Sequence, residues 1–175
     1  MDRNKWILKI LMKKGNETVK EIFLNNMSAN DISKYKEELI ELMDITLSDN
    51  IEQKFPEKLA ERYVDKMSGY IEDNSAIIIG AFEGKKLVGF IWGYITHVYE
   101  EVRVHSYMGA VNPYYRGYHI AKRLMEKQFE EAKNRGIYII EAMVTKSNQA
   151  AYNWHLKTGF EEERVKMRKV LKNDN

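Results

Sequence analysis

The sequence has 175 residues, a length that suits one domain rather than two. Its 28 Lys and Arg residues nearly balance 26 Asp and Glu residues, and the net charge is +2. This balance argues against a nucleic-acid-binding protein. The absence of cysteine excludes a disulfide framework, a cysteine-ligated zinc site and a thiolate nucleophile. With 44% hydrophobic and 11% aromatic residues, the composition is that of a soluble globular protein.

No stretch of the sequence has the roughly 20 apolar residues that a membrane-spanning helix needs. The longest run without Asp, Glu, Lys or Arg covers residues 87–99, and two glycines interrupt it. Lysines break up the apolar residues at the N-terminus, and no small-residue cleavage site follows, so a secretory signal is not expected. We therefore expect a cytoplasmic protein that binds neither membrane nor nucleic acid.

The first half of the sequence predicts a hairpin and two helices. Apolar residues alternate with polar ones over 6–12 and 18–27, and the turn signal Gly15-Asn16 lies between. Ser28 offers an N-cap to a helix with apolar residues at helical spacing: Ile32, Tyr35, Leu39, Leu42 and Met43. A polar connection over 47–54 leads to a second helix that begins near Pro56. Its stripe is Leu59, Tyr63, Met67 and Tyr70 or Ile71.

From residue 75 the apolar pattern is typical of strands. Residues 75–82 and 87–95 predict an antiparallel hairpin around Glu83-Gly84-Lys85, and residues 102–111 predict a third strand. A helix follows, with Ile120, Leu124, Phe129 and Ala132 on one side and Gly136 after its end. The apolar run over 137–144 predicts a central strand covered on both faces. A short helix over 148–157 and a strand over 160–171 complete the chain.

This order of elements predicts an α/β (α+β) fold in a single domain over 1–175. We expect a mixed, mostly antiparallel central sheet flanked by about four helices, with residues 1–27 as an N-terminal hairpin extension.

The segment between the third strand and the following helix is the most informative. Gly117 lets the backbone turn tightly and approach a ligand closely. N–H groups at a helix start lack intrahelical acceptors and lie at the positive end of the helix dipole, so such a place binds phosphate. From the residues alone, a plain strand-to-helix turn with a solvated Arg116 explains the pattern equally well.

The segment Val111-x-Pro113-x-x-Arg116-Gly117-x-x-Ile120-Ala121 resembles the acetyl-CoA motif of the GNAT acetyltransferase superfamily. That motif reads Gln or Arg, two residues, Gly, one residue, then Gly or Ala. Arg116 and Ala121 match it, whereas His119 stands in place of the middle glycine and either crowds the pyrophosphate or adds a donor to it. The resemblance implies that acetyl-CoA contacts the strand end and the turn, at Gly109, Ala110, Val111, Arg116, Gly117, Tyr118, His119, Ile120 and Ala121.

A second segment, Asn148-x-x-Ala151-x-x-Trp154-His155-x-x-x-Gly159-Phe160, resembles the closing motif of the same family. The family form is Asn-x-x-Ala-x-x-Leu-Tyr-x-x-x-Gly-Phe, which puts Asn148 at a cofactor-binding position. His155 occupies the place of the tyrosine that faces the sulfur of coenzyme A. The resemblance implies that His155 protonates the departing thiolate, with Tyr152 as the alternative acid. A chemically idle histidine near a helix C-terminus is the other interpretation.

The resemblance also implies direct attack of a primary amine on the thioester in a ternary complex, with no metal and no covalent enzyme intermediate. A backbone N–H at about 109–111, where the strand before the turn splays from its neighbour, would meet the oxyanion. Three candidate bases share one face of the preceding strand, namely Glu101, His105 and Tyr107. His105 is preferred because imidazole suits proton transfer near neutral pH.

The acceptor and the assembly stay open at this point. A small-molecule amine or a peptide amine fits the resemblance, and the sequence does not choose between a monomer and a homodimer. Acidic residues at 44, 49 and 52 would steer a cationic amine, and tyrosines near the expected cleft would offer a stacking wall. Because of His119 and His155, a non-catalytic acyl-CoA-binding or regulatory module is an alternative. A protein-interaction domain that has lost the cofactor is a further one.

Overall fold

The structure is a computed structural model that describes residues 8–12, 20–50 and 55–170. The chain divides into two compact units, residues 1–143 and residues 144–175. The first unit holds the sheet and the helices α1 to α4, and the second holds α5, Gln149–Lys157. That the two units form one domain stays a prediction. Within the described ranges, no helix is long and apolar enough to cross a membrane.

The described strands form one six-stranded sheet in the order β1-β2-β3-β4-β5-β6. Their bounds are β1 Leu8–Met12, β2 Lys20–Asn26, β3 Ala76–Glu83, β4 Lys86–Val98, β5 Glu101–Val111 and β6 Ile139–Ala142. Neighbouring strands are antiparallel except β5 and β6, which are parallel. The predicted mixed, mostly antiparallel sheet is therefore confirmed. The pairing of β1 with β2 confirms the N-terminal hairpin, whose expected turn lies outside the described residues.

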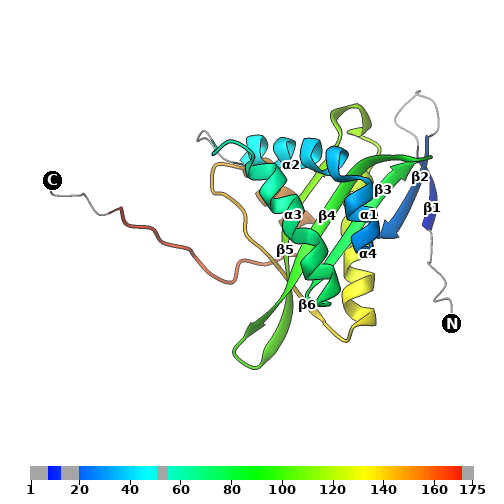
Figure 1. The fold of residues 1–175 in the computed structure, drawn as a ribbon. Coiled ribbons are helices and arrows are strands. Elements are labelled where there is room, and N and C mark those ends of the chain that lie inside the picture. The colour runs from blue at the N-terminus through cyan, green and yellow to red at the C-terminus, as the bar shows by residue number, and fades with distance from the viewer. Residues whose placement is uncertain (1–7, 13–19, 51–54, 171–175) are drawn as a thin grey trace. The chain divides into compact units, whose positions relative to one another are not determined.

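Helices cover both faces of the sheet (Figure 1). On one face lie α1 Ala29–Lys34, α2 Lys36–Asn50 and α3 Leu59–Glu72, and on the other lies α4 Ile120–Asn134. The alternation of β3 explains the two cores. Ala76 and Ile78 pack against the three-helix side, whereas Ile77 and Ile79 pack against the α4 side.

The first predicted helix is in fact two helices. Ser28 caps α1 through a capping box with Asp31, as the sequence suggests. Tyr35 then leaves helical geometry, at φ −108° and ψ 26°, and its buried ring packs 5.1 Å from that of Phe82. The expected polar connection also begins later, because α2 continues to Asn50 and buries Leu47 in the core.

Two of the strand predictions are wrong. The run over 137–144 is not a central strand, since only Ile139–Ala142 pair, and within the described chain they pair with β5 alone. A charged residue, Glu141, interrupts the apolar run. Residues 160–170 form no strand either, and Val165 and Met167 are mostly exposed. Alternation predicts a strand only where a neighbour is present to pair with it.

Candidate active site

A β-bulge marks the part of β5 that the sequence assigns to the site. Trp92 pairs with Met108 and Gly93 with Ser106, so Tyr107 is an extra residue with no partner in β4. A bulge of this kind bends a strand and redirects its side chains. Tyr107 and Met108 accordingly both pack against the cluster beneath α1 to α3, although they are consecutive.

Beyond the bulge, β5 extends past its parallel neighbour. Pairing with β6 ends at Ser106 opposite Ala142, whereas β5 continues to Val111. We call residues 107–111 the β5 fork, because within the described chain no β6 residue pairs with them. The family resemblance implies a gap of this kind between these strands, and its opening after Ser106 argues against a closed sheet that has lost the cofactor.

Two backbone N–H groups of the fork point away from β4. The Asn112 N–H donates to the Val88 carbonyl on the β4 side at 2.9 Å. Because strand N–H groups alternate between the two sides, those of Gly109 and Val111 point to the unpaired side. The Gly109 carbonyl points to the same side as the Gly109 N–H, and it accepts a hydrogen bond from Thr46 Oγ1 in α2 at 3.1 Å. This contact supports the orientation away from β4.

Position 109 is suited to close approach by a ligand. Gly109 is exposed at the surface, and it has no side chain to cover the fork. A Cβ atom there would lie 3.0 Å from the Phe90 carbonyl oxygen, so a side chain would strain the strand pair. The fork thus presents bare backbone donors where the resemblance implies the oxyanion.

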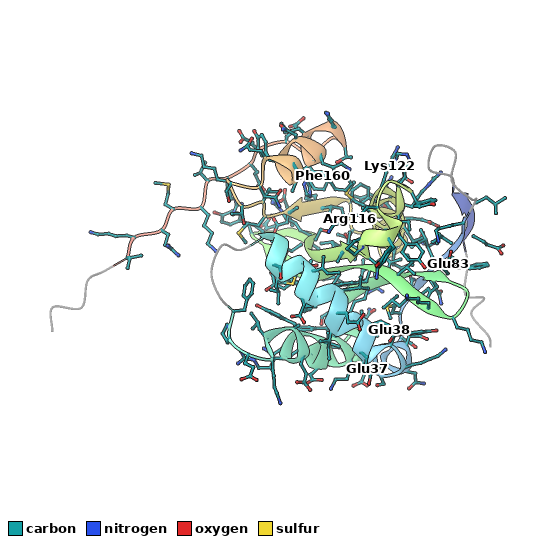
Figure 2. The ribbon with its side chains drawn as sticks, turned by 90° about the horizontal axis from the view of Figure 1, so that it is seen from above. Glu37, Glu38, Glu83, Arg116, Lys122 and Phe160 are labelled. Carbon is teal, nitrogen blue, oxygen red and sulfur yellow. The ribbon has the colours of Figure 1, made fainter. Side chains whose placement is uncertain are left out.

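A tight turn connects the fork to α4. The short 3-10 helix η1, Pro113–Tyr115, follows Asn112, whose side chain accepts the Tyr114 N–H at 3.1 Å. Gly117 then adopts φ +87°, the left-handed region in which glycine is favoured. Arg116 and Lys122 flank this turn and are exposed, on the opposite side of the sheet from Glu37 and Glu38 in α2 (Figure 2).

His119 also adopts a left-handed conformation, with φ 58° and ψ 19°, as the residue before α4. This conformation explains why the family motif carries glycine at the corresponding place. The His119 side chain makes no capping hydrogen bond, so it gives the first-turn N–H groups of α4 no acceptor. The side chain of Ala121 is exposed beside them, whereas that of Ile120 is buried.

A partly buried cluster of side chains packs against this turn. Tyr115 Oη donates to Glu83 Oε2 at 2.5 Å, and Lys20 Nζ donates to Glu83 Oε1 at 3.1 Å while lying 4.5 Å from the Tyr115 ring centroid. Burial and this hydrogen bond raise the pKa of Tyr115 to about 12, and the same bond, with help from Lys20, lowers the pKa of Glu83. Tyr118 is 3% exposed, so only its backbone remains a candidate for ligand contact.

Of the three candidate bases, His105 has the most suitable surroundings. The Glu101 carboxylate accepts a hydrogen bond from Arg103 Nε at 2.9 Å. Tyr107 Oη donates to Tyr63 Oη at 3.2 Å, and burial raises the pKa of its phenol. His105 Nδ1 lies 2.9 Å from Glu141 Oε1, a side-chain pair typical of an oriented imidazole.

The motif residues of the second unit are held by contacts within that unit. Asn148 Oδ1 accepts the Ala151 N–H at 3.0 Å and so caps α5. His155 Nδ1 donates to the Ala151 carbonyl at 2.8 Å, because a carbonyl can only accept, and its ring packs edge-on against those of Trp154 and Phe160. Tyr152 Oη donates to Glu162 at 3.0 Å, and this bond raises the pKa of the phenol and so makes it a weaker acid.

Two residues of the site are not predicted from the sequence. Glu141 contacts His105, and the one signal for it is a charge inside an otherwise apolar run. Thr46 contacts Gly109 from α2, and nothing in the sequence marks it. Among the described residues, no group of three or more His, Asp or Glu side chains is arranged to hold a metal ion.

The chain is similar to known proteins in sequence and in fold. The model of the acetyltransferase (GNAT) family matches residues 39–160. A search of curated proteins found no match.

Solved structures of the same fold include three acetyltransferases. One, an aminoglycoside acetyltransferase from an uncultured soil metagenomic sample in complex with sisomicin, is 19% identical over 86% of this chain and 97% of its own, with a TM-score of 0.66. An aminoglycoside N-acetyltransferase in complex with CoA is 17% identical over 85% and 94%, with a TM-score of 0.67. The ribosomal-protein-alanine N-acetyltransferase of Brucella melitensis is 16% identical over 86% and 99%, with a TM-score of 0.65.

Proposed function

The chain belongs to the GNAT acetyltransferase family, and on that premise we propose that it is an acetyl-CoA-dependent N-acetyltransferase acting on a primary amine. The observation that carries the proposal is the β5 fork. Its outward N–H groups at Gly109 and Val111 are followed, after one turn, by the start of α4, which His119 does not cap with its side chain. The N–H groups of the β5 fork suit a thioester carbonyl, and the start of α4 suits a diphosphate.

The residues around the turn fit coenzyme A. A diphosphate takes backbone N–H donors at a helix start and is attracted by the helix dipole. Arg116 and Lys122 are exposed on either side of this start and add positive charge. Gly109 leaves the fork uncovered, and an aminoglycoside N-acetyltransferase of the same fold forms a complex with CoA.

Bound acetyl-CoA would supply an acyl group on a thiol leaving group. One of the outward N–H groups, that of Gly109 or that of Val111, donates to the oxyanion, a contribution of about 3 kcal/mol. His105 accepts the proton of the attacking amine through water. The amine attacks directly, so no covalent bond to the protein is needed.

His155 is the proposed acid for the departing thiolate, on the strength of the family motif. Its Nδ1 hydrogen is used by the Ala151 carbonyl, so Nε2 of the imidazolium is the atom that donates. His155→Phe should lower kcat at least tenfold and leave the Kd for acetyl-CoA unchanged, as judged by steady-state kinetics and calorimetry. An unchanged kcat would remove His155 from the reaction.

A small-molecule amine is the proposed acceptor. Two of the structural neighbours are aminoglycoside acetyltransferases, and one of them was solved with sisomicin.

The experiment that tests the function is an acceptor screen that follows release of the CoA thiol with a thiol-reactive dye. Because the chain has no cysteine, every thiol detected comes from the cosubstrate. At least one amine in a panel of polyamines, amino sugars and arylalkylamines should release thiol in step with acetylated product. Binding of acetyl-CoA without release for any amine would instead support a non-catalytic module, and no binding at millimolar concentration would overturn both.

A further inference from the structure

A charged side-chain group joins β5 to β6 just before the fork. His105 and Glu141 are direct partners in the parallel register, so their side chains leave the sheet on the same face. His105 Nδ1 lies 2.9 Å from Glu141 Oε1. Arg103, two residues earlier on the same face, donates from Nη1 to Glu141 Oε2 at 3.1 Å. The two oxygens of one carboxylate therefore hold two different side chains.

Burial and charge fix the hydrogen on one nitrogen of His105. The side chains of His105 and Arg103 are 11% and 8% exposed, and that of Glu141 is 27% exposed. The Arg103 guanidinium, which stays protonated in proteins, donates to the other oxygen of Glu141, so this side chain serves as a carboxylate acceptor. An ionised carboxylate can only accept a hydrogen bond. The His105 Nδ1 must consequently donate, which leaves the lone pair of the neutral imidazole on Nε2.

We propose that Glu141 is a positioning residue for His105, which it holds in the Nδ1-protonated tautomer so that Nε2 accepts the proton of the acceptor amine. The inference rests on the proposed function, because it concerns the same reaction. The proton moves from the amine nitrogen through water to Nε2, and the imidazolium keeps both hydrogens until Nε2 returns one to solvent. Glu141 stays ionised throughout and transfers no proton.

The other groups that face His105 do not replace Glu141. Tyr94 in β4 lies 5.0 Å away and Tyr107 lies 6.2 Å away, both measured between ring centroids, and these are ring contacts rather than hydrogen bonds. Burial raises the pKa of both phenols, so they stay neutral near neutral pH. Arg103 bonds to the carboxylate and not to the imidazole.

Kinetics separate this role from a purely structural one. Glu141→Ala should lower kcat about 10-fold to 100-fold, with the KM for acetyl-CoA within about twofold, by analogy with the loss of orienting carboxylates behind metal-bound histidines. Glu141→Gln keeps an oxygen that accepts from Nδ1 and should recover most of the rate. In a His105→Ala background, Glu141→Ala should lower kcat by less than about twofold, because Glu141 affects the reaction only through the imidazole of His105. Full additivity of the two substitutions would overturn the inference.

A second measurement needs no turnover. Nitrogen-15 NMR of the imidazole in the free protein should show the Nδ1-protonated tautomer in the wild type and lose it in Glu141→Ala. Glu131→Gln is the matched control, since Glu131 is 17% exposed and accepts from Arg135 Nε at 3.0 Å in α4, away from His105. That variant should keep both the tautomer and the rate, and thermal melting checks that every variant is folded.

Failure of this inference is distinguishable from failure of the proposed function. If the wild type acetylates an amine while Glu141→Ala keeps its kcat and its tautomer, the role of Glu141 is wrong and the function stands. If the wild type releases no thiol with any amine, the function fails, and with it the reaction in which Glu141 would act. An Nε2-protonated His105 in the wild type would overturn the inference on its own.

Discussion

His119 is the residue at which this chain departs most clearly from its family motif, and its backbone gives the reason for the motif. Its φ of +58° lies in the left-handed region, where a β-carbon is crowded and glycine is not. The protein thus keeps the geometry of the glycine while carrying an imidazole. Histidine tolerates this region better than most residues, yet it still costs free energy there.

The first prediction follows from this strain. His119→Gly should raise the free energy of unfolding by about 0.5 to 1 kcal/mol, because glycine relieves the left-handed strain at a modest entropic cost. Urea denaturation measures the change. His97→Gly is the matched control, since His97 is exposed within β4, and glycine inside a strand should destabilise by about 0.5 to 1 kcal/mol. A loss of stability in His119→Gly would contradict the argument.

The glycines of the bulge show a different constraint. Gly93 has an ordinary strand conformation, but a Cβ there would lie 2.7 Å from Val104 Cγ1 and 2.8 Å from Gln128 Nε2. Space, rather than backbone conformation, therefore requires glycine at this position. The close packing of α4 against the bulged strand pair depends on it, because Gln128 of α4 is fully buried.

At the scale of elements, the turn before α4 is held by the first hairpin. Glu83 at the end of β3 accepts hydrogen bonds from Tyr115 and from Lys20 in β2. Tyr115 lies immediately before Arg116 and Gly117. The N-terminal hairpin, which the family motifs leave without a role, thereby buttresses the turn that is proposed to bind the diphosphate.

The second prediction concerns this contact at alkaline pH. Folding raises the pKa of Tyr115 from its ordinary value of 10 to about 12. A group whose pKa rises on folding contributes stability that is complete below pH 10 and is lost as the pH approaches 12. At pH 11 the loss should be about 1.4 kcal/mol.

Tyr115→Phe should lack this part of the alkaline decline, although it is less stable at neutral pH by the lost hydrogen bond. Denaturant titrations at pH 9 and pH 11 give the change in the free energy of unfolding between the two pH values for each protein. Tyr114→Phe is the control, because Tyr114 is 87% exposed and adjacent in sequence. Its free energy of unfolding should fall between these pH values as steeply as that of the wild type. Equal changes for all three proteins would show that the Tyr115 phenol is not held as described.

Local pattern predicts most elements of this fold, and its failures have one cause. The β3–β4 hairpin, β5, α4 and α5 have periodicity, caps and turn residues that agree with one another, and all are observed. The break at Tyr35 and the edge position of β6 depend on which side chains pack beside them, which local spacing does not contain. The same holds for the strand expected over 160–171, which needed a partner strand.

The candidate site divides in the same way. Arg116 and Gly117 could be found because they lie in one short motif with a glycine turn. Glu141 could not be assigned to His105, since the two are 36 positions apart and meet only through the parallel register. Thr46 meets Gly109 across 63 positions. Contacts of this kind are set by the assembly of the sheet and not by spacing in the sequence.

For the whole molecule, binding at the start of α4 should appear as global stability, because a ligand that binds only the folded state adds RT ln(1 + [L]/Kd). Acetyl-CoA at one hundred times its Kd should raise the free energy of unfolding by about 2.7 kcal/mol. Pantetheine, which lacks the diphosphate, should add much less at the same concentration. Equal effects of the two would mean that the diphosphate is not held at this helix.

The last prediction uses two glycines of like conformation to separate binding from folding. Gly117 before α4 and Gly136 after it have φ of +87° and +74°, so valine at either place is strained and should lower the melting temperature. Only Gly117→Val should also raise the Kd for acetyl-CoA, by at least tenfold in calorimetry, because the turn that aims the N–H groups is distorted. Gly136→Val should bind as the wild type does, and if both variants or neither lost affinity, the proposed diphosphate site would be misplaced.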